Sequence, residues 1–111
     1  MTWTPEKLDT IPEVYRDFMM TLKPVLDSRD PRVVLRFTGI PFGQIYNGLT
    51  TRHDYEVEQV RELARNLEQA GFVQEDRLGF FTPTEAGEEL IKAMAAEEEA
   101  GRARVPPFPK L

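Results

Sequence analysis

Cysteine is absent from the 111 residues of this chain. Its absence excludes a disulfide framework, a thiolate zinc site and a cysteine nucleophile. No apolar run approaches the ~18 residues that a transmembrane helix requires, and the first residues have neither the basic start nor the apolar centre of a signal peptide. We therefore expect a cytoplasmic protein without a membrane partner.

Side chains that carry chemistry are scarce, since His53 is the only histidine and Ser28 the only serine. A hydrolase triad would need both, and nothing around Ser28 resembles a nucleophile elbow. The group His53-Asp54-x-Glu56 offers nitrogen and oxygen ligands to a metal, but one histidine beside helix-capping carboxylates is more typical of a surface turn. Residues 39–48 lack the Lys-Ser/Thr ending of a phosphate loop. We predict that the protein is not an enzyme and holds neither a metal nor a cofactor.

Positive charge is also in short supply. The chain has 14 lysines and arginines against 19 aspartates and glutamates, which gives a formal net charge of −5. A field of this sign opposes binding to polyphosphate, so a nucleic-acid site would need a local basic patch. The length is sufficient for one domain with a single core.

Helix signals dominate the N-terminal third. Thr4-Pro5-Glu6 and Thr10-Ile11-Pro12-Glu13 compete as helix starts, and we favour a helix that runs through the second. Pro24 should kink or end this helix. Asp30-Pro31 has the form of another start, and Gly39 closes the apolar segment 33–38, for which we predict a central buried helix. The first of these helices carries an apolar stripe at three- and four-residue spacing: Ile11, Val14, Tyr15, Phe18, Met19 and Leu22.

Two further helices are predicted around a turn. Pro41 opens the first, and the turn is marked by Asn47-Gly48 and Thr50-Thr51. The second spans residues 54–70, with Asp54 as its cap and Gly71 as the left-handed residue that ends it. The buried face of the first helix is predicted to consist of Phe42, Ile45, Tyr46 and Leu49, and that of the second of Val57, Val60, Leu63, Ala64, Leu67 and Ala70.

A hairpin and a last helix complete the pattern. Residues 72–75 and 79–82 are predicted to be strands joined by a short loop, in which Gly79 takes a positive φ. Thr82-Pro83-Thr84-Glu85 predicts a helix with Thr82 as cap and Pro83 at its first position. This helix should bury Leu90, Ile91 and Met94 and end within residues 97–101. The proline-rich segment 102–111 should be an extended or disordered tail.

This order of elements resembles the winged-helix domains of bacterial regulators of the MarR and PadR type. The segment Leu67-Glu68-Gln69-Ala70-Gly71 stands where these families end the recognition helix, and Phe81-Thr82-Pro83-Thr84-Glu85-Ala86-Gly87 stands where they open the helix after the wing. The likeness covers residues 31–95. It implies a mostly α, α+β fold: a winged helix-turn-helix with a two-stranded wing in residues 31–101, an extra N-terminal helical extension in 1–30, and a tail in 102–111.

The resemblance also implies a function, that of a small transcriptional regulator. Helix 54–70 would lie in the major groove of double-stranded DNA, and the chain would form a homodimer through its N-terminal and C-terminal helices. The competing hypothesis is a protein-interaction winged helix that uses its acidic helix face or the tail with Phe108, because residues 51–70 hold five acidic side chains and three basic ones. The predicted nucleic-acid contacts are Thr51, Arg52, His53, Gln59, Arg65 and Arg77.

Overall fold

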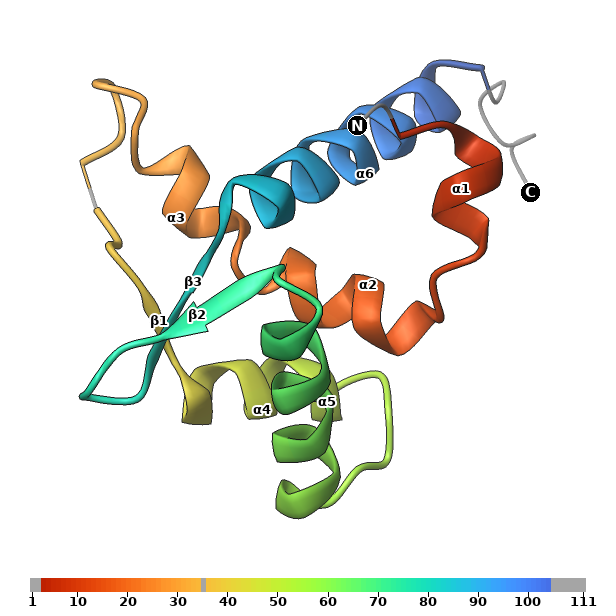
Figure 1. The fold of residues 1–111 in the computed structure, drawn as a ribbon. Helices are drawn as coiled ribbons and strands as arrows, with labels where there is room; N and C mark the ends of the chain where they lie inside the picture. Colours follow the sequence, from red (N-terminus) through yellow and green to blue (C-terminus); the bar gives the residue numbers. More distant parts are fainter. Residues whose placement is uncertain (1–2, 35, 105–111) are drawn as a thin grey trace, which may run out of the picture.

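Three N-terminal helices precede the first strand in our computed structural model, which describes residues 3–34 and 36–104, and side chains as far as residue 100. The elements are α1 (Pro5–Asp9), α2 (Glu13–Met20), α3 (Lys23–Asp27), β1 (Ile40–Pro41), α4 (Phe42–Thr50), α5 (Val57–Gln69), β2 (Val73–Glu75), β3 (Phe80–Pro83) and α6 (Glu85–Arg104). In Figure 1, α3 and α6 lie at one end, α4 and α5 at the other, and α2 with the sheet lies between. The fold is therefore α+β and mostly helical.

The sheet is small and antiparallel, with strand order β1-β3-β2. The predicted hairpin is confirmed as β2 and β3, with Val73 opposite Pro83. Gly71 and Gly79 have φ angles of 86° and 83°, as their positions after a helix and in a tight loop require. The edge strand β1 was not predicted, because two residues are too few to show a strand periodicity. Its Ile40 lies opposite Phe81 on β3.

The predicted apolar stripe of residues 11–22 faces the core, although Ile11 and Leu22 lie outside α2 and Ile11, Val14 and Tyr15 are only partly buried. Phe18, Met19 and Leu22 have no exposed surface. The Phe18 ring meets the Phe81 ring edge-on at a centroid distance of 6.1 Å. One buried cluster also includes Ile45 of α4 and residues of α5 and α6, so the N-terminal helices are part of the same core. The two N-terminal helix starts compete in the sequence, but both are used, since α1 ends at Asp9 and α2 begins at Glu13. The prediction that Pro24 kinks or ends this helix is wrong: α2 already ends at Met20, and Pro24 lies in the first turn of α3, where a proline is tolerated.

The predicted buried helix at residues 33–38 is wrong. The described residues of this segment are irregular, and Val34 is 96% exposed. Asp30 Oδ1 accepts from the Arg32 N–H at 2.9 Å, and the Phe37 N–H donates to Ser28 Oγ at 2.7 Å. Such side-chain contacts satisfy backbone groups that a helix would have used, so the helix-start signal of Asp30-Pro31 produces a turn instead.

Two predicted helix caps are also shifted. The α5 helix begins at Val57, with Glu56 rather than Asp54 as its cap residue. The α6 helix is capped by Thr84, whose Oγ1 accepts from the Gly87 N–H at 3.2 Å. Thr82 cannot serve as the cap because β3 continues through Pro83. The α6 helix also continues to Arg104, so the first residues of the predicted tail are helical, and residues 105–111, including Phe108, lie outside the described part.

The start of α6 lies directly against the junction between α5 and β2. The Thr84 N–H donates to the Phe72 carbonyl at 3.0 Å. A Cβ atom at Gly87 would lie 2.0 Å from the same carbonyl oxygen and 3.0 Å from the Met19 side chain. Only glycine permits this approach, which sets the position of α6 relative to the hairpin.

An ion pair holds the other side of α6. Arg29 Nη1 and Nη2 donate to the two Glu88 carboxylate oxygens at 2.7 and 2.8 Å. The hydrogen bond from Arg29 is the main reason that the pKa of Glu88 lies below its ordinary value. This two-bond contact joins the turn after α3 to α6 over 59 residues of sequence.

Candidate nucleic-acid interface

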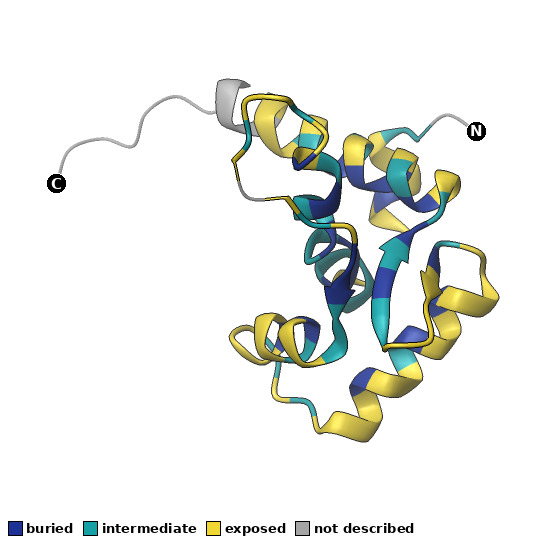
Figure 2. Ribbon diagram, turned by 90° about the vertical axis from the view of Figure 1, so that its left-hand side faces the viewer, coloured by how far each residue is buried: buried dark blue, intermediate teal, exposed yellow. Residues whose placement is uncertain are grey.

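The outer face of α5, the helix that leads into the hairpin, is exposed along its length. Val60, Ala64 and Leu67 turn toward the core, as predicted. Figure 2 shows the opposite face of this helix as exposed. Val57 and Ala70 were predicted to be buried but are exposed, because they lie at the first turn and the cap of a helix shorter than expected. The exposed residues of the helix are Val57, Glu58, Gln59, Arg61, Glu62, Arg65, Asn66, Glu68 and Gln69.

The charges on this face are mixed. Arg65 Nη2 lies 3.0 Å from Glu62 Oε2, and both side chains are more than half exposed. Such a pair contributes only about 0–1 kcal/mol, so Arg65 is readily released to another anion. The Arg61 guanidinium lies 4.1 Å from the centroid of the Phe42 ring, a cation–π distance. Arg61 is thus held against α4, whereas the partner of Arg65 lies on α5 itself.

A polar contact ties the turn between α4 and α5 to α2. Arg52 Nη1 lies 3.1 Å from Asp17 Oδ1, and His53 Nε2 lies 2.7 Å from Asp17 Oδ2. The side chains of Asp17 and His53 are 16% and 19% exposed, whereas that of Arg52 is 67% exposed. Two predicted DNA contacts therefore share one largely buried carboxylate, and His53 is turned away from solvent.

Aromatic side chains complete this corner of the molecule. The His53 and Tyr55 rings lie 5.6 Å apart between centroids. The Tyr46 hydroxyl donates to the Tyr55 carbonyl at 3.2 Å, and the Tyr46 ring stacks on Phe42. We call Asp17, Tyr46, Arg52, His53 and Tyr55 the corner cluster. This cluster fixes the turn that leads from α4 to the N-terminus of α5.

The other predicted contacts are placed as follows. Thr51 Oγ1 donates to the Gly48 carbonyl at 2.8 Å, and Gln59 Oε1 accepts from the Glu56 N–H at 2.8 Å. Both side chains therefore have local backbone partners, which leaves the Gln59 NH₂ group to point outward as a donor. Arg77 is exposed in the hairpin loop beside Leu78, which is 81% exposed. The structure thus groups Thr51, Arg52 and His53 at one end of α5 and places Arg77 on a separate projection (Figure 1).

Sequence reasoning missed Asp17. It lies 35 residues from Arg52 and 36 from His53, and no local pattern links an aspartate on an amphipathic helix to a distant turn. It also missed that Asn66 Nδ2 donates to the Tyr15 hydroxyl at 2.8 Å. Both contacts depend on how α2 packs against the helix pair, which spacing along the chain does not encode.

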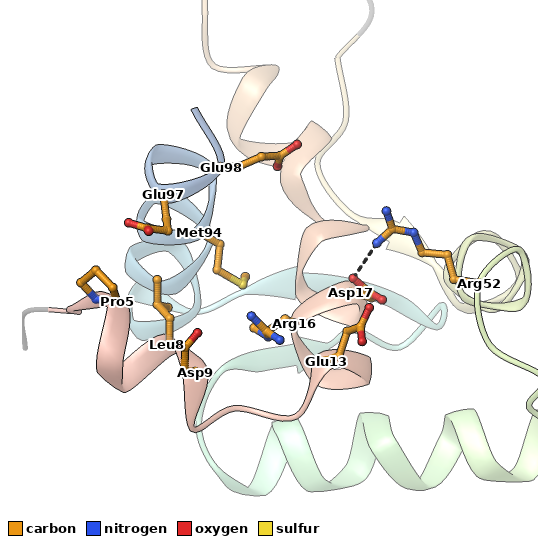
Figure 3. A pocket seen from close by; sticks show the side chains of 10 residues that line it. All are labelled: Pro5, Leu8, Asp9, Glu13, Arg16, Asp17, Arg52, Met94, Glu97 and Glu98. Atoms are coloured by element: carbon orange, nitrogen blue, oxygen red, sulfur yellow. Dashed lines mark hydrogen bonds and ion pairs between the residues drawn. The ribbon is translucent and has the colours of Figure 1, made fainter. Parts of the chain in front are cut away.

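A hollow of about 360 Å³ lies between α1, α2 and α6, beside the corner cluster. In Figure 3, Arg16 lies near its centre and the Asp17–Arg52 ion pair at its edge. The Nε atom of Arg16 is buried without a hydrogen-bond partner among the described residues. Carboxylates outnumber the two arginines of the lining: Asp9, Glu13, Asp17, Glu97 and Glu98. The hollow is therefore unsuited to a polyanion.

No family model matches this chain, and neither a curated protein nor a solved structure matches it. In the part of the chain that the structure describes, no helix is both long and apolar enough to cross a membrane. Among those same residues, no three histidine, aspartate or glutamate side chains come together in a way that could hold a metal ion. Interpretation of the site therefore depends on its geometry and charge.

Proposed function

We propose that this protein is a small cytoplasmic winged-helix regulator that binds double-stranded DNA through α5. The observation that carries the proposal is the order α2, β1, α4, α5 and hairpin, combined with an outer face of α5 that no other element covers. A helix-turn-helix places its second helix in the major groove, which is wide enough to admit one. In this proposal α4 is the first helix of the helix-turn-helix and α5 is the second.

The expected DNA contacts are inferred from the hydrogen-bonding and charged groups that each side chain has available for a ligand. Gln59 and Arg65 are exposed on α5: the Gln59 NH₂ group can donate to an acceptor on a base edge, and the Arg65 guanidinium is suited to a guanine edge. Thr51 and Arg52 lie in the turn before α5, where phosphate contacts are expected, but the Thr51 hydroxyl already donates to the Gly48 carbonyl and Arg52 is paired with Asp17. Arg77 extends from the hairpin loop toward the adjacent backbone or minor groove.

The charges predict weak binding with a shallow salt dependence. Arg77 is an exposed cation, and the partner of Arg65, Glu62, is itself exposed, whereas Arg52 is paired with the largely buried Asp17. Each phosphate neutralised contributes about −0.9 to the slope of log K against log salt, so two cations predict a slope of about −2 per protomer.

The test is a titration of the full chain with a pool of random-sequence duplexes at low and moderate salt. Arg65→Ala and Arg77→Ala should each weaken binding and flatten the salt slope by about 0.9. Lys92→Ala is the matched control, because it removes the same charge from α6 at the other end of the molecule (Figure 1). Failure of the full chain to bind any duplex at low salt would overturn the proposal.

The proposal includes a homodimer through the N-terminal and C-terminal helices. Leu90, Ile91 and Met94 of α6 are buried in the protomer, but the helix continues for ten residues beyond Met94. Those ten residues span about 15 Å, at 1.5 Å per residue. Glu98, Glu99 and Ala100 are exposed there. Sedimentation equilibrium at high protein concentration should give twice the protomer mass, and a monomer there would refute the dimer.

One observation favours a second function, a protein-interaction module. Three glutamates and two arginines lie on α5, and one of those arginines is already paired with Glu62. A face of this composition suits a partner with a basic surface. The same DNA titration separates the two functions, because a module of this kind would show no salt-dependent duplex binding.

A further inference from the structure

Asp17 occupies an unusual position for an acidic residue of an amphipathic helix. Its side chain is 16% exposed, and its two oxygens contact two consecutive residues of a distant turn. An ionised carboxylate only accepts hydrogen bonds, so Arg52 and the Nε2–H of His53 are the donors. Both oxygens are thus used to hold the turn between α4 and α5.

The same contact determines what Arg52 can bind. Arg52 lies in the turn that leads from α4 into α5, where a helix-turn-helix contacts phosphate. The Asp17 carboxylate occupies its Nη1 edge at 3.1 Å and cancels its charge at that point. Figure 3 shows Arg52 directed toward Asp17 at the edge of the acidic hollow.

We propose that Asp17 is a positioning residue that acts as an internal substitute for DNA phosphate: it fixes the turn through His53 and keeps Arg52 from a phosphate contact. This inference depends on the proposed DNA binding, and it predicts that Asp17 lowers the affinity for DNA. A protein whose Arg52 is paired with Asp17 gains no counterion release from that arginine.

The experiment measures salt slopes for duplex binding by the full chain. Asp17→Asn should steepen the slope by about 0.9 and raise the affinity, because Arg52 then neutralises one phosphate. Glu13→Gln is the matched control: it removes the same charge from the same helix and the same hollow, but it does not contact Arg52. Adding Arg52→Ala to the Asp17→Asn variant should return the slope to that of the wild type.

A role of Asp17 in packing alone would weaken binding and leave the slope unchanged. Equal slopes for Asp17→Asn and Glu13→Gln, with clear binding by the wild type, would therefore overturn this inference and leave the proposed function standing. Absence of binding by the wild type and by every variant at low salt would overturn both.

A second measurement needs no change at Asp17, in case that variant does not fold. If Asp17 withholds Arg52 from DNA, then Arg52→Ala in the otherwise wild-type chain should leave the salt slope unchanged. A slope flatter by about 0.9 in Arg52→Ala would mean that Arg52 already contacts a phosphate, and would contradict the inference.

Discussion

The junction between α6 and the hairpin differs from the corner cluster in how it is held. The junction depends on shape, since the backbone at Gly87 lies against the Phe72 carbonyl and beside the Met19 side chain. The corner cluster depends on polar side chains, since Asp17 joins Arg52 and His53 to α2. The junction should therefore respond to a change of volume, and the corner cluster to a change of charge or hydrogen bonding.

The largest effect is expected at the junction. Gly87→Ala would place a methyl group within overlap distance of the Phe72 carbonyl, so α6 must shift. The expected loss is about 1–3 kcal/mol of unfolding free energy, measured by urea denaturation. Gly43→Ala is the control, because nothing lies within 4 Å of a Cβ atom there; it should stabilise α4 by about 0.4–1 kcal/mol. Equal stability of the two variants would contradict the difference between the regions.

The next effect is expected in the corner cluster. His53→Ala removes the contact with Asp17 and the packing on Tyr55. The expected loss is about 1–2 kcal/mol in the same denaturation experiment. Asp54→Ala changes an exposed neighbour and should stay within about 0.5 kcal/mol of the wild type. If both variants lose the same stability, the histidine does not hold the turn.

Removal of a single hydroxyl group from the same cluster should have a smaller effect on stability. Tyr46→Phe removes the hydrogen bond to the Tyr55 carbonyl, which joins α4 to the start of α5. The expected loss is about 0.5–1.5 kcal/mol. Tyr15→Phe removes the contact with the exposed Asn66 amide and should cost less. A larger loss of stability for Tyr15→Phe would contradict this expectation and would mean that the Tyr15–Asn66 contact stabilises the fold more than the corner cluster does.

The smallest effect is expected from the ion pair of α6. Arg29→Ala should cost up to about 1 kcal/mol at neutral pH, because the partners are 58% and 22% exposed. The pKa of Glu88 is lowered in the folded state, so its stabilisation is present above the ordinary value of 4.5 and is lost as the pH falls through the folded pKa. The difference from the wild type should therefore shrink in acid. Arg77→Ala should show no such pH dependence, and a constant difference for Arg29→Ala would contradict the pairing.

Local signals predicted much of the fold. Gly71 and Gly79 require positive φ, and the apolar spacing along α2, α4 and α5 found most of the core. The helix at residues 33–38 failed because Ser28 and Asp30 offer hydrogen bonds that the spacing of apolar residues does not reveal. The close approach at Gly87 could not be predicted from the sequence either, because it depends on how α6 packs against the junction between α5 and β2.

The candidate site was less predictable than the fold. Arg65 and Arg77 were placed on the surface, and Thr51 and Gln59 were found with local backbone partners. His53 turned inward because Asp17, far away in sequence, provides a partly buried acceptor. Sequence spacing identifies which side chains lie on a helix, but pairing between elements decides which of them stay available to a ligand.

The most direct test of the proposed function is to map the surface that DNA touches. Amide chemical shifts of the ¹⁵N-labelled chain would be recorded while a random duplex is added at low salt. If α5 binds DNA, changes are expected on the outer face of α5, in the turn at Thr51 and Arg52, and in the loop at Arg77, with α6 unaffected. Changes confined to α6, or no changes at all, would contradict the proposed DNA binding.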